Sequence, residues 1–116
     1  MKSLKAADFN LGDKISGNIL RQVVSYNKEG RRTLSLILSG VDVNGVPLPA
    51  DEEYQYFLSN RADDWFWDLF SRKHLTWEAA VGSHVTIEKQ SYMVNWPAGI
   101  YHTVEAFVPI SLEVPT

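Results

Sequence analysis

The sequence predicts a mainly β fold, a five-stranded Greek-key barrel with one helical segment between its third and fourth strands. Three observations support this fold class. Apolar and polar residues alternate over several short stretches, turns rich in Gly, Asn and Pro separate them, and one longer segment has its apolar residues at helical spacing. The length of 116 residues is that of one domain.

The first two predicted strands form a hairpin. The first strand begins at Lys14, and its alternation is interrupted at Gly17 and again near Leu20, which predicts a bulged strand. Residues 27–30 end in a glycine and form the turn. The second strand covers residues 33–40, with its three leucines on one face.

The third predicted strand is short. Residues 42–49 contain Asn-Gly and two prolines, so they form a loop. The strand that follows covers residues 54–58 and places Tyr54, Tyr56 and Leu58 on one face.

A helical segment and the fourth strand come next. Asn60 is the predicted N-cap of the helix, acidic residues in the first turn suit the helix dipole, and Gly82 is the predicted C-cap. Residues 84–89 form the fourth strand, in which Val85 and Ile87 point inward.

The fifth strand completes the predicted barrel. A loop over residues 91–100 leads to this strand, which covers residues 101–110. Residues 1–13 are a lead-in segment, residues 14–110 the barrel domain and residues 111–116 a short tail. Two apolar residues of the lead-in are expected to pack on the domain, Phe9 and Leu11.

A helix between the third and fourth of five strands is the arrangement of the OB-fold. Residues 82–87, where a turn glycine leads into an alternating strand, fit the entry to the fourth strand. In strand order and size, over residues 11–109, the sequence resembles the OB-fold family of single-stranded DNA-binding proteins. This resemblance implies a role in DNA replication. The chain departs from the bacterial type because it has no Gly-rich linker with an acidic tail, as expected of a minimal, phage-type member.

Composition excludes several classes of protein. The chain has no cysteine, which excludes a disulfide scaffold, a cysteine-ligated zinc site and a thiol enzyme. Its histidines lack metal-ligand spacing, and its adjacent carboxylates diverge rather than face each other. We therefore expect no cofactor, no metal and no catalytic activity. Neither a signal peptide nor a membrane-spanning run is present, so we expect a cytoplasmic protein.

The net charge of −3 conceals a segregation of charge. Residues 14–32 carry five cations against one acid, a balance of +4. Residues 42–68 carry seven acids against one cation, a balance of −6. The first hairpin is thus basic, while the long loop, the third strand and the start of the helix are acidic.

The two loops that OB-folds use to hold a ligand carry complementary groups. The first loop, residues 25–32, has three cations and a tyrosine, and the second, residues 90–99, has aromatic rings and no charge. Cations suit phosphates and flat rings stack on bases. We expect phosphate contacts from Arg21, Lys28, Arg31 and Arg32, and base stacking from Tyr26, Tyr56, Tyr92 and Trp96. The alternative for these residues is structural, with a solvated hairpin tip and a Trp96 ring packed over the barrel end.

The densest aromatic run lies in the helical segment. Successive helix residues point about 100° apart, so one face does not bury Trp65, Phe66 and Trp67 together. The tryptophan left at the edge either caps the open end of the barrel or anchors a partner. Asp64 and Asp68 would repel nucleic acid, so this face would meet a protein or a second copy of the chain.

The sequence therefore predicts non-catalytic binding of single-stranded nucleic acid, DNA or RNA with DNA favoured, and with little sequence preference. The alternative is a protein-interaction or structural subunit that uses the acidic, Trp-rich face. Neither function involves a membrane.

Overall fold

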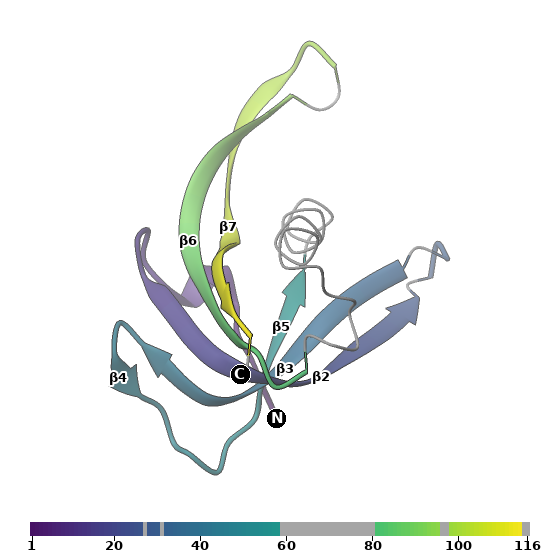
Figure 1. Ribbon diagram of the computed structural model, residues 1–116. Coiled ribbons are helices and arrows are strands. Elements are labelled where there is room, and N and C mark those ends of the chain that lie inside the picture. Colours follow the sequence, from purple (N-terminus) through teal and green to yellow (C-terminus); the bar gives the residue numbers. More distant parts are fainter. Residues whose placement is uncertain (27, 31, 59–80, 96–97, 115–116) are drawn as a thin grey trace.

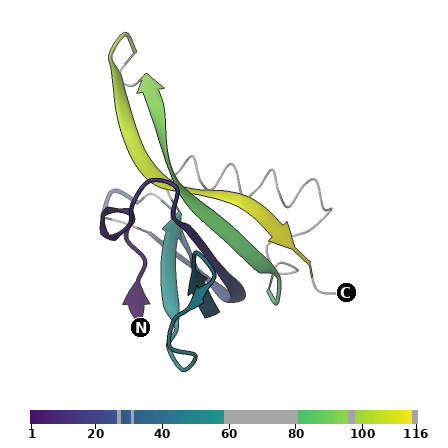
Figure 2. The ribbon, with the colours of Figure 1, turned by 90° about the vertical axis from the view of Figure 1, so that its left-hand side faces the viewer.

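One strongly curled, barrel-like β-sheet organises the chain (Figures 1 and 2). The computed structural model describes residues 1–26, 28–30, 32–58, 81–95 and 98–114, with only the backbone of residues 32 and 33. Five strands form most of the sheet: β2 (Lys14–Tyr26), β3 (Arg32–Val43), β5 (Tyr54–Leu58), β6 (His84–Asn95) and β7 (Tyr101–Glu113). Two short strands, β1 (Lys2–Ser3) and β4 (Val46–Pro47), and one 3₁₀ turn, η1 (Ala6–Asp8), complete the described elements.

The strand order is β1-β5-β3-β2-β6-β7, with β4 paired to β3. All the pairings are antiparallel except that of β1 with β5. The β2 strand joins the two halves of the sheet, because it pairs with β3 along its length and with β6 only over residues 14–18.

The predicted bulges in β2 are confirmed. The register with β3 shifts between Ser16 and Asn18 and again between Ile19 and Arg21. Glycine suits the first shift, because a Cβ atom on Gly17 would lie 3.0 Å from a methyl group of Val41, which is closer than an ordinary contact. These shifts bend β2 so that its first half pairs with β6 while its second half continues with β3.

The predicted count of five strands is wrong, because seven strands are described. The two that were missed, β1 and β4, have two residues each and are too short to show an alternating pattern. Three of the predicted strands are also longer than expected. The β3 strand continues to Val43, β6 includes residues 90–95 of the predicted loop, and β7 continues to Glu113 in the predicted tail.

The predicted helical segment, from Asn60 to Gly82, lies almost entirely outside the described residues. Of this segment, only Val81 and Gly82 are described, and they form a turn that leads into β6. The backbone N–H of Gly82 donates to the carbonyl oxygen of Ile19 at 2.7 Å, which ties this turn to β2.

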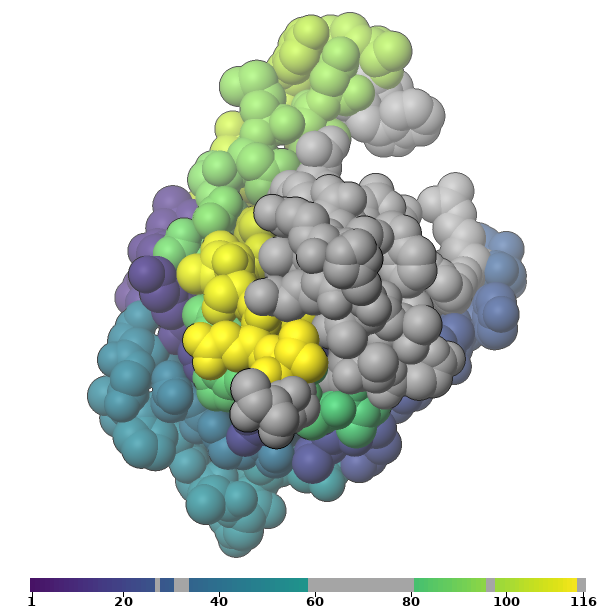
Figure 3. Space-filling model, in the orientation of Figure 1, coloured from purple at the N-terminus to yellow at the C-terminus, as the bar shows by residue number. Residues whose placement is uncertain are grey.

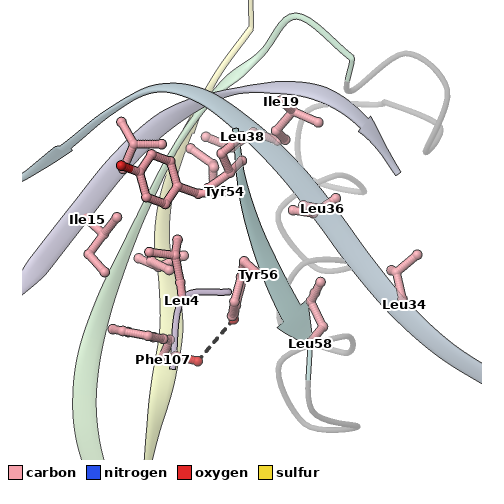
Figure 4. Packing of buried hydrophobic residues seen from close by; sticks show 14 residues of the cluster. Leu4, Ile15, Ile19, Leu34, Leu36, Leu38, Tyr54, Tyr56, Leu58 and Phe107 are labelled. Atoms are coloured by element: carbon pink, nitrogen blue, oxygen red, sulfur yellow. Dashed lines mark hydrogen bonds between the residues drawn. The ribbon is translucent and has the colours of Figure 1, made fainter. Parts of the chain in front are cut away.

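The core lies on the concave face of the sheet (Figure 4). The predicted inward direction of Val85 and Ile87 is confirmed, since both are buried. The side chains predicted to share one face of β3 and of β5 are buried together as well: Leu34, Leu36, Leu38, Tyr54, Tyr56 and Leu58. Phe107 from β7 joins them, with its ring centroid 6.1 Å from that of Tyr56. This shared apolar layer joins the β3–β5 half of the sheet to the β6–β7 half.

The N-terminal segment is part of this core. Leu4 is buried, and the Phe9 ring meets Phe107 edge-on at a centroid distance of 5.4 Å, as predicted. Leu11, in contrast, is exposed. The buried Lys89 ammonium donates to the carbonyl oxygen of Phe9 at 2.8 Å and holds the segment against β6.

The described part of the chain includes no helix long and apolar enough to cross a membrane.

Candidate nucleic-acid interface

Two long hairpins project from the sheet, away from β4 (Figure 1). One is the end of β2 and β3, where residues 28–30 form a turn. The other is the outer part of β6 and β7, residues 90–104, which we name the arm. The arm stands clear of the body in the space-filling view (Figure 3). The sheet thus presents two separate tips, each at one of the hairpins that contain the predicted ligand loops.

The first tip carries a cation and an aromatic ring in the open. The Tyr26 side chain is 71% exposed, and Lys28 is exposed in the turn that follows. The backbone of Arg32 lies opposite Tyr26. The Arg32 side chain and all of Arg31 lie outside the described residues.

Arg21 lies farther down β2 and is engaged in an ion pair. Its guanidinium donates to the Glu53 carboxylate at 3.3 Å. Arg21 is paired with Ile37 in the sheet, and Ile37 is paired with Gln55, so the ion pair crosses β3 on the face opposite the core. A phosphate would compete with Glu53 for Arg21.

Tyr56 requires a correction. The sequence analysis expected its ring to stack on a base, but the side chain is only 2% exposed and belongs to the core. Its hydroxyl donates to the carbonyl oxygen of Phe107 at 3.2 Å (Figure 4). Burial raises the pKa of Tyr56, and Tyr92 raises it further. The ring is closed to a ligand because Tyr56 shares the inward face of β5 with Tyr54 and Leu58.

The second tip consists of the arm. Tyr92 lies on β6 opposite Val104 and is partly buried, close enough to Tyr56 to affect its ionisation. Trp96, the other ring expected here, lies outside the described residues. At the tip, the Asn95 side chain accepts a hydrogen bond from the Gly99 backbone N–H at 2.9 Å and helps to shape the turn.

The sequence analysis missed two exposed aromatic residues. Tyr101, opposite Asn95 at the end of the arm, is 66% exposed. Phe57, on the face of β5 opposite the core, is 54% exposed. The alternation that turns Tyr56 inward turns Phe57 outward, so the exposure of Phe57 was predictable from the sequence. Tyr101 had no such signal, because its strand extends beyond the core.

Phe57 and the apolar residue Val23 lie on the same face of the sheet, on either side of Ser35. Ser35 of β3 is paired with Phe57 on one side and with Val23 of β2 on the other. Ser35 is buried and accepts a hydrogen bond from the Gln55 amide at 3.0 Å. This convex row, Val23–Ser35–Phe57, lies next to the row that contains Arg21.

Charge is distributed unevenly between the two tips. The arm, residues 90–104, has no Lys, Arg, Asp or Glu, whereas the first tip contains Lys28, Glu29, Arg31 and Arg32. Among the described residues, no group of three His, Asp or Glu side chains is placed to hold a metal ion. The residues expected at a protein interface, Trp65, Trp67, Asp64 and Asp68, lie outside the described part of the chain.

Comparison with known protein families, with curated proteins and with solved structures gives no match for this chain.

Proposed function

We propose that this chain is an OB-fold protein that binds single-stranded nucleic acid, preferably DNA, without strong sequence preference. The strand order β5-β3-β2-β6-β7 supports the OB-fold. Numbered one to five along the chain, these five strands lie in the order 3-2-1-4-5, and the first pairs with both the second and the fourth. The OB-fold is a partly open Greek-key barrel of five strands. The Tyr56–Phe107 hydrogen bond joins the third and fifth strands, where such a barrel closes.

The observation that supports the proposal most is that the two tips present different kinds of side chain. One tip presents the exposed Tyr26 and Lys28, and the other presents Tyr101 on an arm without charge. Single-stranded nucleic acid needs both kinds of group, because its phosphates are anionic and its bases are flat. Phe57 lies on the convex surface of the second and third barrel strands, which OB-folds use to bind oligonucleotides.

Titration of a labelled oligothymidine with the protein tests the proposal. Each stacked base is worth about 1–3 kcal/mol, so Tyr101→Ala should weaken binding by at least about fivefold. Lys28→Ala should weaken binding and make the slope of log K against log salt shallower by about 0.7, because one phosphate contact is lost. Lys5→Ala is the matched control, since Lys5 is an exposed lysine of the N-terminal segment. Equal effects of Lys28→Ala and Lys5→Ala, or no binding at low salt, would refute the proposal.

A further inference from the structure

The arm is a two-stranded ribbon, and no other described strand pairs with its outer edges. The orientation of the backbone groups at these edges follows from Lys89, whose backbone N–H donates to the carbonyl oxygen of Asp13 and whose carbonyl accepts from the N–H of Gly12. Both groups of Lys89 therefore point away from β7. In an antiparallel pair, opposite residues either exchange both bonds or point both sets of groups outward. Phe107, opposite Lys89, must then direct its N–H and C=O to the outer edge of β7. The Tyr56 hydroxyl reaches Phe107 from that side.

The same alternation extends along the arm. The register between β6 and β7 has no shift from Ile87 to Asn95. Backbone direction alternates with a period of two. The N–H and C=O groups of Tyr101, Thr103 and Glu105 therefore face the outer edge of β7, like those of Phe107. No described strand pairs with this edge.

In the part of the chain that the structure describes, the outer edge of β7 over residues 101–106 also lacks the features that keep edge strands from pairing. Natural edges are blocked by lysine, proline, bulges or covering segments. Residues 101–108 contain no lysine, proline or register shift, and their only charge is Glu105. Glu105 forms an ion pair with Lys89 of its own chain at 3.4 Å. Tyr, Thr, Val and Phe in this stretch all favour strands.

Among the described residues, the base of the arm lies near the core, where Tyr92 is partly buried close to Tyr56, and the outer part of the arm carries exposed side chains. None of the residues in the core cluster belongs to residues 90–104. An isolated two-stranded hairpin is marginally stable in water, and a third or fourth strand is what normally stabilises it. Met93, opposite Thr103, is 64% exposed and Tyr101 is 66% exposed, so the arm has apolar surface to bury.

We propose that β7 pairs antiparallel with β7 of a second copy of this chain, which joins the two arms into a four-stranded sheet. A two-fold axis at Thr103 would place Tyr101 of each copy opposite Glu105 of the other. Like charges then do not meet, since each carboxylate faces a phenol ring and the rest of the arm has no charge. Two identical edges supply matching donors and acceptors, so the interface is self-complementary.

Light scattering coupled to size exclusion tests the pairing without nucleic acid, so its outcome is independent of the proposed function. We expect wild type to have twice the 13.2 kDa mass of one chain. Thr103→Pro removes an outward N–H from β7 and should give a monomer. Met93→Pro is the matched control, because Met93 lies directly opposite and its N–H points to the outer edge of β6. This variant should remain a dimer.

Cross-linking provides a measurement that does not depend on proline. The chain has no cysteine, so Thr103→Cys introduces one thiol per copy. A short bifunctional maleimide should link this variant into dimers and leave Lys28→Cys, on the other hairpin, largely unlinked. A monomeric wild type at NMR concentrations, or equal cross-linking of the two variants, would overturn the pairing. So would a dimer that Thr103→Pro and Met93→Pro weaken equally.

Discussion

Tyr56 and Phe57 are adjacent in the chain but lie in opposite environments. Tyr56 is 2% exposed and Phe57 is 54% exposed, because successive strand residues face opposite sides. The Tyr56 side chain fills the core and donates a hydrogen bond to the Phe107 carbonyl. Truncation of the exposed Phe57 side chain, in contrast, removes little buried surface.

We therefore expect Tyr56→Ala to lower the free energy of unfolding by about 3–5 kcal/mol. Phe57→Ala should change it by no more than about 0.5 kcal/mol, as is usual for exposed positions. Tyr56→Phe keeps the ring and removes only the hydrogen bond, so it should cost about 1 kcal/mol. Urea unfolding of the three variants measures these differences. Equal losses for the two alanine variants would show that the face assignment of β5 is wrong.

Asp13 links its own turn, residues 10–13, to the turn between β3 and β4 through its carboxylate. The carboxylate accepts hydrogen bonds from the Asn10 backbone N–H at 2.8 Å and from the Asn44 side-chain amide at 3.0 Å. These two bonds, in that order, lower the pKa of Asp13 below its ordinary value of 3.8, and Lys89 contributes to the shift. Ionised Asp13 therefore stabilises the folded state.

The sign of this effect sets the pH dependence. A lowered pKa gives stability that is complete above pH 3.8 and is lost as the pH falls through the folded-state pKa. Asp13→Asn should therefore be less stable than wild type near neutral pH, and the difference should shrink in acid. Denaturant unfolding at several pH values measures it. Asn44→Gly is a companion variant, because Asn44 has a positive φ of 52° that glycine tolerates, and it should reduce the same pH dependence. A difference that stays constant down to pH 2 would contradict the assignment.

The arm is an element that the core does not require. Replacing residues 93–103 by Asn-Gly closes the hairpin on the pair Tyr92 and Val104, whose backbone groups face each other, with a favoured two-residue turn. This shortened chain should keep its fold and melt within a few degrees of wild type, because every residue of the core cluster is retained. It should lose most of its affinity for oligothymidine. Circular dichroism and the binding titration follow the two outcomes, and an unfolded product would mean that the arm supports the core.

Sequence patterns predicted the elements near the core better than those beyond it. Val85 and Ile87 alternate with polar residues, so the inner part of β6 and its buried face were predictable. The outer part, up to Asn95, has no core to face and was taken for a loop. Its strand form follows from pairing with residues 101–106 of β7, which is information that a local pattern does not contain.

The candidate site was predicted in part for the same reason. The exposure of Tyr26 and Lys28 follows from their place at a turn, which the glycine signal located. Tyr56 was assigned to the ligand although its own alternation with Phe57 indicated the core. The sequence places Tyr101 on a strand but does not indicate which side of the strand is buried. The structure shows that its side chain is 66% exposed.

At the scale of the whole molecule, the net charge of −3 describes neither the basic first hairpin nor the acidic segment of residues 42–68. Some acidic residues of the 42–68 segment already neutralise cations within the chain, as in the pairs of Lys2 with Glu52 and Arg21 with Glu53. These contacts are exposed and add little stability. These ion pairs would have a larger effect on ligand binding. Because Arg21 is paired with Glu53, the turn that contains Lys28 is the more accessible basic site.

The sheet is built from two local hairpins that meet at one short seam. The β2–β3 and β6–β7 pairs connect residues close in sequence. In the seam, Lys14–Asn18 pairs with His84–Glu88, about 70 residues later in the chain. Closing such long loops is entropically slow, so non-local pairing tends to limit the rate of folding. On the ribosome, the first hairpin would emerge and form while its seam partner is still being synthesised. One edge of the bulged half of β2 then remains without its partner until residues 84–88 have been synthesised, and an unpaired edge is open to wrong pairing.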